Sequence, residues 1–254
     1  MSLASELIQR KLDWIIPQWP APDNVRALFT TRNGGFSEGA CATMNLARSP
    51  DSGVPHVAQN LALLHDVIGV NPVWLSQVHG TDVLAIDNPP PMPVGDAAVA
   101  TRPGRAAAVR VADCLPVLFC DRAGTQVAAA HAGWRGLAAG VLEATVAAMH
   151  VEPQELIAWF GPAIGPDAFE VGDDVRDTFL QHDAESAAAF SSYPARPGKW
   201  LADLFMLASM RLSATGLTDH FGGGICTVSN PDRFFSHRRD KTPGRMAALI
   251  WLER

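Results

Sequence analysis

The sequence is poor in charge and has no long apolar run, and both shortages narrow the classes of function. Charged residues make up 18% of the 254 residues, whereas soluble proteins average about 25%. The chain has 20 basic and 26 acidic side chains and no five consecutive basic ones, so nucleic acid is not an expected partner. No apolar run approaches the roughly 18 residues of a membrane span, and the first residues form no signal core. We therefore expect a cytoplasmic protein with no membrane partner.

Cysteine is also scarce, which argues against a disulfide framework. The four cysteines are widely scattered along the chain, at Cys41, Cys114, Cys120 and Cys226. We expect each to be a free thiol, available for thiol chemistry or metal binding. Two nucleotide-binding patterns are missing as well, since no Gly-x-Gly-x-x-Gly follows a predicted strand and no Gly-x4-Gly-Lys-Ser/Thr occurs.

The composition that remains is that of an ordinary globular protein. Hydrophobic residues make up 48% of the chain, enough for one large domain or two modest ones. Short apolar runs predict strands at 27–31, 73–78, 106–112, 115–120, 126–130 and 156–160. Apolar residues at helical spacing predict helices at 54–67, 137–150, 173–181 and 201–214. Because strands and helices mix without regular alternation, we expect a layered α/β (α+β) domain around a mixed sheet rather than a doubly wound sheet.

Three segments place a metal-binding or nucleophilic side chain at the end of an apolar run. These residues are His79, Cys114 and His131. A lone histidine or cysteine in such a place is most often a satisfied core residue. Here, however, each is followed within two residues by a glycine or proline that opens the backbone, and strand ends are where sheet proteins collect active groups. We therefore predict that the three residues share a site.

Several chemistries are open to these three side chains. Two imidazoles and one thiolate form the open ligand set of a catalytic Zn²⁺. The same set suits a blue-copper centre, which would use a weak axial ligand such as Met. Without a metal, Cys114 would be a nucleophile with His131 or His79 as its general base. All of these chemistries remain open at this point. A further alternative is that the three are unrelated core residues and form no site.

Cationic residues predict an anion site beside this cluster. Arg135 brings a rigid fork of donors between Gly133 and Gly136, which allow close backbone approach. A helix expected to begin near Leu137 adds free N–H groups. The simpler interpretation is that Trp134 and Arg135 only cap this helix and pack against it. Residues 226–254 carry six basic and three acidic side chains, which favours a small anionic substrate unless the run is merely solvated.

Asp113 stands beside Cys114 but is expected to play a different part. In a regular strand, neighbouring side chains point to opposite faces, so the two do not face one site unless the strand ends there. We therefore expect Asp113 to brace the backbone or a neighbouring group.

Five ordered motifs together resemble the YfiH-type laccase-domain family, also called multicopper polyphenol oxidases or peptidoglycan editing factors. The likeness runs from about Ile15 to Leu252. The motifs are Gln77–Gly80, Ala112–Val117, His131–Gly136, Gly161–Gly165 with Phe169–Gly172, and Phe235–Asp240 with Gly244–Met246.

The resemblance implies both a fold and an activity. It implies one domain over residues 1–254, with αββα layers, acting as a monomer. It implies a metal, Zn²⁺ or Cu²⁺, held by the residues that match His79, Cys114 and His131. It also implies phosphorolysis of adenosine, inosine, guanosine and methylthioadenosine, with purine nucleoside and phosphate as the small-molecule partners, and hydrolytic deamination of adenosine.

The resemblance and the residue chemistry together assign candidate roles. Cys114 and His131 are expected to be catalytic as well as metal ligands. For deamination, a metal lowers the pKa of water from 15.7 toward about 7, and Glu170 is our candidate for carrying the proton. The candidates for phosphate or ribose contacts are Arg135, Arg238, Arg245 and Asn45.

One stretch departs from the family pattern, and two other functions stay open. Residues 47–53 and the pair Asn60-Leu61 replace a Gly-x-His-x-Gly-Asp type of stretch and a downstream Asn-Arg. The first alternative function is a copper-dependent polyphenol oxidase. No two of the eight histidines are separated by one residue, which disfavours a trinuclear copper cluster but not a single copper. The second is a non-catalytic role in cell-wall precursor quality control, for which the sequence offers no repeat or amphipathic stretch.

Overall fold

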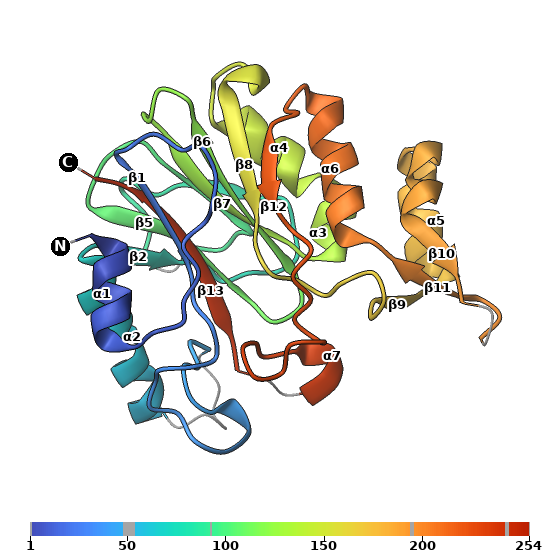
Figure 1. Cartoon of the computed structure of the whole chain (residues 1–254). Coiled ribbons are helices and arrows are strands. Elements are labelled where there is room, and N and C mark those ends of the chain that lie inside the picture. Colours follow the sequence, from blue (N-terminus) through green and yellow to red (C-terminus); the bar gives the residue numbers. More distant parts are fainter. Residues whose placement is uncertain (1, 48–53, 92, 194–195, 242–243, 254) are drawn as a thin grey trace.

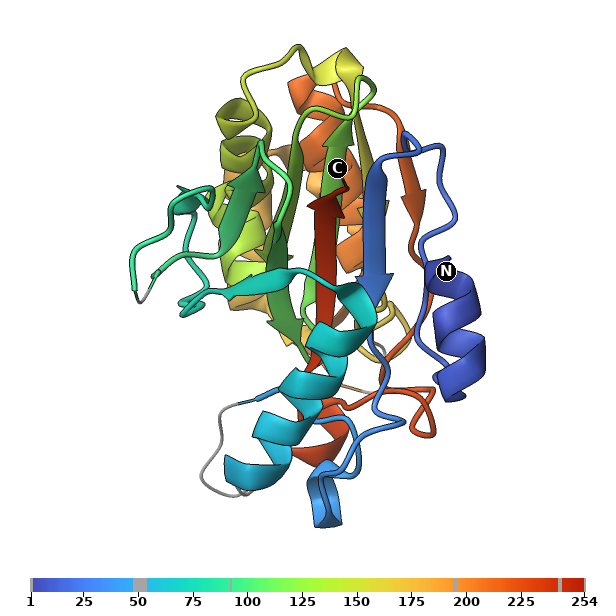
Figure 2. The same cartoon turned by 90° about the vertical axis from the view of Figure 1, so that its left-hand side faces the viewer.

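A computed structural model describes residues 2–47, 54–91, 93–193, 196–241 and 244–253. Two β-sheets lie face to face, and helices cover both outer faces (Figures 1 and 2). The predicted α/β class and the αββα layers are confirmed. Within the described part of the chain, none of the helices combines the length and apolar character that crossing a bilayer requires.

The first sheet is built around the last strand of the chain. Its order is β1-β13-β5-β2, with bounds Val25–Phe29, Met246–Leu252, Arg105–Val111 and Asn71–Trp74. β13 runs antiparallel to both of its neighbours, whereas β2 runs parallel to β5. Two helices pack on its outer face, α1 (Leu3–Arg10) and α2 (Val54–Ile68).

The second sheet has six strands. Its order is β12-β8-β6-β7-β4-β3, with bounds His220–Gly222, Leu156–Phe160, Leu115–Asp121, Val127–Ala132, Ala97–Ala100 and Val83–Ala85. Only the outer pairs, β12 with β8 and β3 with β4, are parallel. The helices on its outer face are α3 (Trp134–Ala139), α4 (Val141–Ala148) and α6 (Leu204–Thr215).

Side-chain alternation divides the core into layers and aims β7 at the site. Val127 and Ala129 lie in the core between the sheets, whereas Ala128 and Ala130 face the helices. Two residues beyond Ala129, His131 falls on the inter-sheet face, at the end of its strand. The alternation therefore points this imidazole to one end of the space between the two sheets.

A smaller sheet projects at one end of the molecule (Figure 1). Its order is β10-β11-β9, with bounds Phe190–Ser192, Lys199–Ala202 and Glu170–Gly172, beside α5 (Asp173–His182). The last helix, α7 (His237–Asp240), precedes β13. Short 3-10 helices lie at Gly39–Cys41, Pro153–Glu155 and Ala184–Ala189.

All six predicted strands and all four predicted helices exist, but the strand expected at 73–78 ends at Trp74, and two helix predictions need correction. The helix expected at 137–150 begins at Trp134 and is broken at Gly140, where φ is +102°, into α3 and α4. The helix expected at 201–214 begins at Leu204, because the Asp203 carboxylate accepts the first free backbone N–H groups. Residues 201–202 belong instead to β11.

Candidate metal centre

The structure brings His79, Cys114 and His131 together from three separate segments, which we call the ligand trio. Their ligand atoms all lie within 4.8 Å of one another. His79 lies in the segment after β2, Cys114 lies in the crossover from β5 to β6, and His131 lies near the end of β7. The predicted meeting of these three side chains therefore occurs, although they are far apart in the sequence.

Strand register explains why Cys114 and His131 meet. On the β6–β7 ladder, Leu115 pairs with Ala132 and Pro116 pairs with His131. One step further along the same register, Cys114 is opposite Gly133. The thiol of Cys114 therefore faces a position without a side chain, next to the imidazole of His131.

Gly133 leaves the space that an ion needs. A Cβ atom at this position would lie 3.0 Å from Cys114 Sγ and 2.9 Å from His79 Cδ2. Its φ of −61° and ψ of 153° are open to any residue, so the missing side chain serves the site and not the backbone. Gly133 is therefore a steric requirement of the ligand trio.

Asp96, which no sequence motif singled out, is the buried carboxylate behind the trio. Asp96 has no exposed surface, and its Oδ1 accepts a hydrogen bond from His131 Nδ1 at 2.8 Å. It also accepts hydrogen bonds from the backbone N–H groups of Val78, His79 and Gly80. The available signal was an aspartate directly before the alanine-rich run 97–100, which the proline-rich stretch 88–95 obscured.

Charge in the trio favours a thiolate beside an imidazolium in the absence of metal. Burial raises the pKa of the Cys114 thiol, but hydrogen bonds and positive charge from His131 and His79 outweigh it and lower that pKa to about 6. Burial lowers the pKa of His131, yet the neighbouring Asp96 and Cys114 groups raise it to about 9. The hydrogen bonds that Asp96 accepts outweigh its burial and lower its own pKa. The site is thus built to hold cations.

The geometry of the trio fits a metal ion. Two ligand atoms bound to one Zn²⁺, at about 2.0 Å for nitrogen and 2.3 Å for sulfur, can be at most about 4.3 Å apart. His79 Nε2 and Cys114 Sγ are 3.9 Å apart. The centroids of the two imidazole rings lie 4.7 Å apart and the ring planes are at 75°, so the rings meet edge to face and do not stack. The donor set, the close approach of His79 to Cys114 and the space beside Gly133 therefore suit an ion with an open coordination position.

A cleft with a volume of about 850 Å³ opens beside the trio, within the usual ~300–1,000 Å³ of small-molecule sites. Its described lining is rich in cationic side chains and contains one carboxylate, that of Asp113. The cationic side chains are Arg110, Arg135, Arg238, Lys241 and Arg245. In a chain with a net charge of −6, this concentration favours an anionic ligand.

The predicted phosphate contacts fall into two groups. Arg135 is exposed at the cleft, its guanidinium 4.3 Å from the Trp134 ring, in the first turn of α3 and not before a helix. Arg238 lines the cleft and donates from Nη1 to the backbone carbonyl of Glu170. Arg245 lines the cleft as well. Asn45 is buried, is not among the described lining residues, and accepts from the backbone N–H groups of Ala47 and Arg245.

Glu170 lies beside the cleft and not in its described lining. Both carboxylate oxygens accept from Nη1 of Arg196 at 3.1 Å. Its role as a proton carrier stays a prediction. Of the divergent stretch 47–53, Ala47 lines the cleft and residues 48–53 lie outside the described part of the chain.

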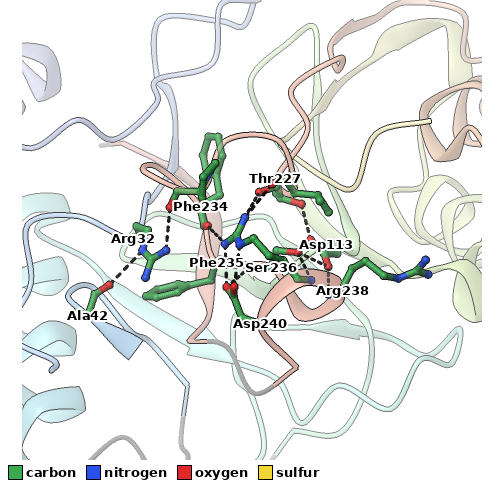
Figure 3. A network of polar contacts seen from close by, with 12 residues as sticks. Arg32, Ala42, Asp113, Thr227, Phe234, Phe235, Ser236, Arg238 and Asp240 are labelled. Atoms are coloured by element: carbon green, nitrogen blue, oxygen red, sulfur yellow. Dashed lines mark hydrogen bonds and ion pairs between the residues drawn. The ribbon is translucent and has the colours of Figure 1, made fainter. Parts of the chain in front are cut away.

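Asp113 braces its neighbours, as expected. β5 ends at Val111, and Asp113 has a φ of +84° in the crossover between the sheets. Its carboxylate accepts from Thr227 Oγ1, Ser236 Oγ and the backbone N–H of Arg238 (Figure 3). This contact fixes the start of α7 against the segment that carries Cys114.

Arg239 completes this group of contacts, which we call the α7 network: Asp113, Thr227, Ser236, Arg239 and Asp240. Its guanidinium donates to three backbone carbonyls and to the carboxylate of Asp240. The side chain of Arg238 extends in another direction, away from Asp240 (Figure 3). The two adjacent arginines therefore have different roles: the guanidinium of Arg239 is bonded to groups of the fold, whereas Arg238 lines the cleft.

The chain is similar to known proteins over nearly its whole length. Residues 26–253 match the sequence model of the family described as multi-copper polyphenol oxidoreductase laccase. A purine nucleoside phosphorylase of Pseudomonas aeruginosa is 50% identical over 94% of this chain and 98% of its own. The purine nucleoside phosphorylase YfiH of Escherichia coli is 49% identical with the same coverage. A crystal structure of a Neisseria meningitidis DUF152 protein has a TM-score of 0.92 and 48% identity, covering 95% of this chain and all of that one.

Proposed function

Since the chain belongs to the multi-copper polyphenol oxidoreductase laccase family, we propose that it is a metal-dependent purine nucleoside phosphorylase, acting as a single-domain monomer. The observation that carries this proposal is the shared cleft, in which the ligand trio and several cationic side chains face one space. Adenosine, inosine, guanosine and methylthioadenosine are the proposed substrates.

Phosphorolysis needs phosphate held against C1′ of the ribose. A phosphate oxygen forms a bond to C1′ while the bond from C1′ to the purine nitrogen breaks, and the purine leaves with the electron pair. Positioning and electrostatic stabilisation carry most of such a reaction. We assign phosphate or ribose contacts to Arg135, Arg238 and Arg245, because all three line the cleft. Asn45 would act only indirectly, through its hydrogen bond to the Arg245 backbone.

The apolar part of the cleft suits a purine base. Ile164, Phe169 and Leu204 are buried and lie among the lining residues. Together they offer aliphatic and aromatic contact surface, which typifies the walls of small-molecule sites. The Arg238 guanidinium lies 5.6 Å from the centre of the Phe169 ring, so a base at this wall would be close to a proposed phosphate contact.

His79, Cys114 and His131 would hold the ion, which we propose to be Zn²⁺ or Cu²⁺. When bound, such an ion supplies Lewis acidity at its open coordination position. The thiol of Cys114, with a pKa of about 6, is already ionised at neutral pH, whereas His131, with a pKa of about 9, must release its Nε2 proton when the ion binds. Hydrolytic deamination of adenosine belongs to the same proposal, and there Glu170 would first have to release Arg196.

A copper-dependent polyphenol oxidase is the second candidate, favoured by the description of the family and by the His-Cys-His ligand set. A blue-copper centre uses a weak axial ligand such as Met or Gln. The described residues that line the cleft include no methionine, and the side-chain amide of Gln77, which does line it, is hydrogen-bonded to the backbone of Arg110. This observation favours the phosphorylase.

The deciding experiment incubates the metal-loaded protein with adenosine and phosphate and separates the products. Phosphorolysis predicts adenine and ribose 1-phosphate, both dependent on phosphate, whereas deamination predicts inosine without phosphate. An Arg135→Gln variant should need more phosphate for half-maximal rate. The absence of product from any purine nucleoside, combined with turnover of a phenol by the copper-loaded protein, would replace the proposal with the oxidase.

A further inference from the structure

One buried carboxylate is bound to two members of the ligand trio. Asp96 is fully buried, and its Oδ1 accepts from His131 Nδ1 at 2.8 Å and from the backbone N–H of His79 at 2.9 Å. Its Oδ2 accepts from the backbone N–H groups of Gly80 at 2.7 Å and Val78 at 3.1 Å. Both oxygens are thus occupied by donors from the two segments that carry the histidines.

The sheet fixes Asp96 in this place. On the ladder between β4 and β7, Ala97 pairs with Ala130, so Asp96 lies directly opposite His131. The backbone N–H of His131 donates to the Asp96 carbonyl at 2.7 Å, and the backbone N–H of Asp96 donates to Asp82 at 3.0 Å. These two bonds hold the backbone of Asp96 in place, independently of the contacts that its carboxylate makes.

The hydrogen bond to His131 decides which ring nitrogen faces the trio. A carboxylate accepts from Nδ1–H, which leaves Nε2 to bind a metal. Nδ1 and Nε2 lie on opposite sides of the ring, so holding Nδ1 at Asp96 also sets the direction of Nε2. Asp96 thereby fixes both the tautomer and the orientation of one ligand.

The bonds to residues 78–80 hold the second ligand. His79 has a φ of +61°, a left-handed conformation that a non-glycine residue seldom adopts without support. Three consecutive backbone N–H groups around it converge on the Asp96 carboxylate. The same group that orients His131 therefore also holds the backbone from which His79 projects.

We propose that Asp96 is the positioning residue of the metal centre, holding His79 and His131 in register with Cys114 without binding the metal itself. The inference rests on the metal site of the proposed function, but not on which reaction occurs there. It predicts that loss of the carboxylate weakens metal binding even where the fold persists.

Asp121 offers a matched control. It is also a buried carboxylate that accepts backbone N–H groups at a turn, from Thr125 at 2.7 Å and Gln126 at 2.9 Å. It has no histidine partner among the described contacts and is not among the described lining residues. An Asp121→Asn variant therefore removes a comparable brace away from the trio.

The test measures Zn²⁺ affinity by competition with a chromophoric chelator for the wild type, Asp96→Asn and Asp121→Asn. We expect Asp96→Asn to bind Zn²⁺ about 10–100-fold more weakly and Asp121→Asn to bind as the wild type does. The absorption bands of bound Co²⁺ should change in Asp96→Asn and not in Asp121→Asn. Wild-type affinity and an unchanged Co²⁺ spectrum in a folded Asp96→Asn protein would overturn the proposal.

A measurement on the wild type keeps the test decisive if Asp96→Asn does not fold. In the Zn²⁺-loaded protein, ¹⁵N spectra of the His131 ring should show a protonated Nδ1 and a metal-bound Nε2, and the reverse arrangement would refute the proposal. A wild type that binds Zn²⁺ in this way but turns over no nucleoside would sink the proposed function and leave the role of Asp96 intact.

Discussion

The ligand trio and the α7 network are both polar clusters beside one cleft, yet they are satisfied in opposite ways. In the α7 network the Arg239 guanidinium is met by three backbone carbonyls and by Asp240. In the trio the ligand atoms of two imidazoles and one thiol converge on each other instead. A polar cluster whose hydrogen bonds are all made within the fold stabilises the structure. A cluster whose ligand atoms converge on a shared space is arranged to bind a ligand.

The largest effect is expected when a member of the ligand trio is replaced. Cys114→Ser should lose its bound metal, and phosphorolysis should fall roughly a thousandfold, because metal polarisation is worth several kcal/mol and each ~1.4 kcal/mol is tenfold in rate. Elemental analysis and product formation measure this. The control is Cys226→Ser, whose thiol accepts the Gly165 N–H at 3.2 Å outside the described cleft lining. Full metal content and activity in Cys114→Ser would show that the trio is only core.

A substitution in the α7 network should lower the stability of the fold and leave the reaction unchanged. Arg239→Met leaves three half-buried carbonyls and a carboxylate without their donor, and it should lower the free energy of unfolding by about 1.5–3 kcal/mol. Urea denaturation measures the loss.

The adjacent arginine is the matched comparison for this prediction. Arg238→Met gives up one side-chain hydrogen bond, to the carbonyl of Glu170, which is worth about 1 kcal/mol. It should therefore stay nearly as stable as the wild type while its KM for phosphate rises. Equal destabilisation by the two substitutions would erase the distinction between scaffold and ligand site.

Gly133→Ala tests whether space is part of the trio. The added Cβ would press on Cys114 Sγ and His79 Cδ2 without straining the backbone, so Zn²⁺ affinity should fall by about tenfold or more. At Gly80, beside His79, a Cβ would find only ordinary contacts at 3.5 Å and beyond. Gly80→Ala should accordingly bind Zn²⁺ normally, and a chelator competition that ranks the two variants alike would contradict the role given to Gly133.

The smallest effect is the acid sensitivity of the α7 network. Burial raises the pKa of Asp240, but the hydrogen bonds and charge of Arg239 outweigh it, so the folded-state pKa is lowered. The stabilisation it provides is present above the ordinary aspartate pKa and is lost as pH falls through the folded-state value. Unfolding measured from pH 5 to pH 3 should therefore show a steeper loss in the wild type than in Asp240→Asn. If stability falls equally with pH in the two proteins, Asp240 makes no such contribution.

Local patterns predicted more of the fold than of the site's support. Apolar runs such as 115–120 and 156–160 place buried strands within one residue of their observed bounds, because burial on both faces leaves a continuous signal. β13 was not predicted, although its run is equally apolar and directly follows a cationic segment. The break at Gly140 depends on a left-handed glycine that periodicity does not register.

The trio could be anticipated because each member ends an apolar run, whereas Asp96 could not. Its partners His79 and His131 are 17 and 35 residues away. The β4–β7 register places Asp96 opposite His131, and a bridge between Ser76 and Val94 brings the His79 segment alongside. The same holds for the pairing of Asp113 with Ser236, which are 123 residues apart. The residue types in the sequence indicate which side chains are able to bind a metal. Which other side chains hold them in position depends on strand pairing, which local patterns do not give.

The origin of the three ligands gives the centre a mechanical consequence. His79 follows a strand of the four-stranded sheet, His131 belongs to the six-stranded sheet, and Cys114 lies on the chain that passes from one to the other. An ion bound there would fasten the two halves of the sandwich at their open end. At a free metal concentration of 100 times the dissociation constant, binding adds about 2.7 kcal/mol to the unfolding free energy. Metal loading would thus stabilise the walls of the cleft.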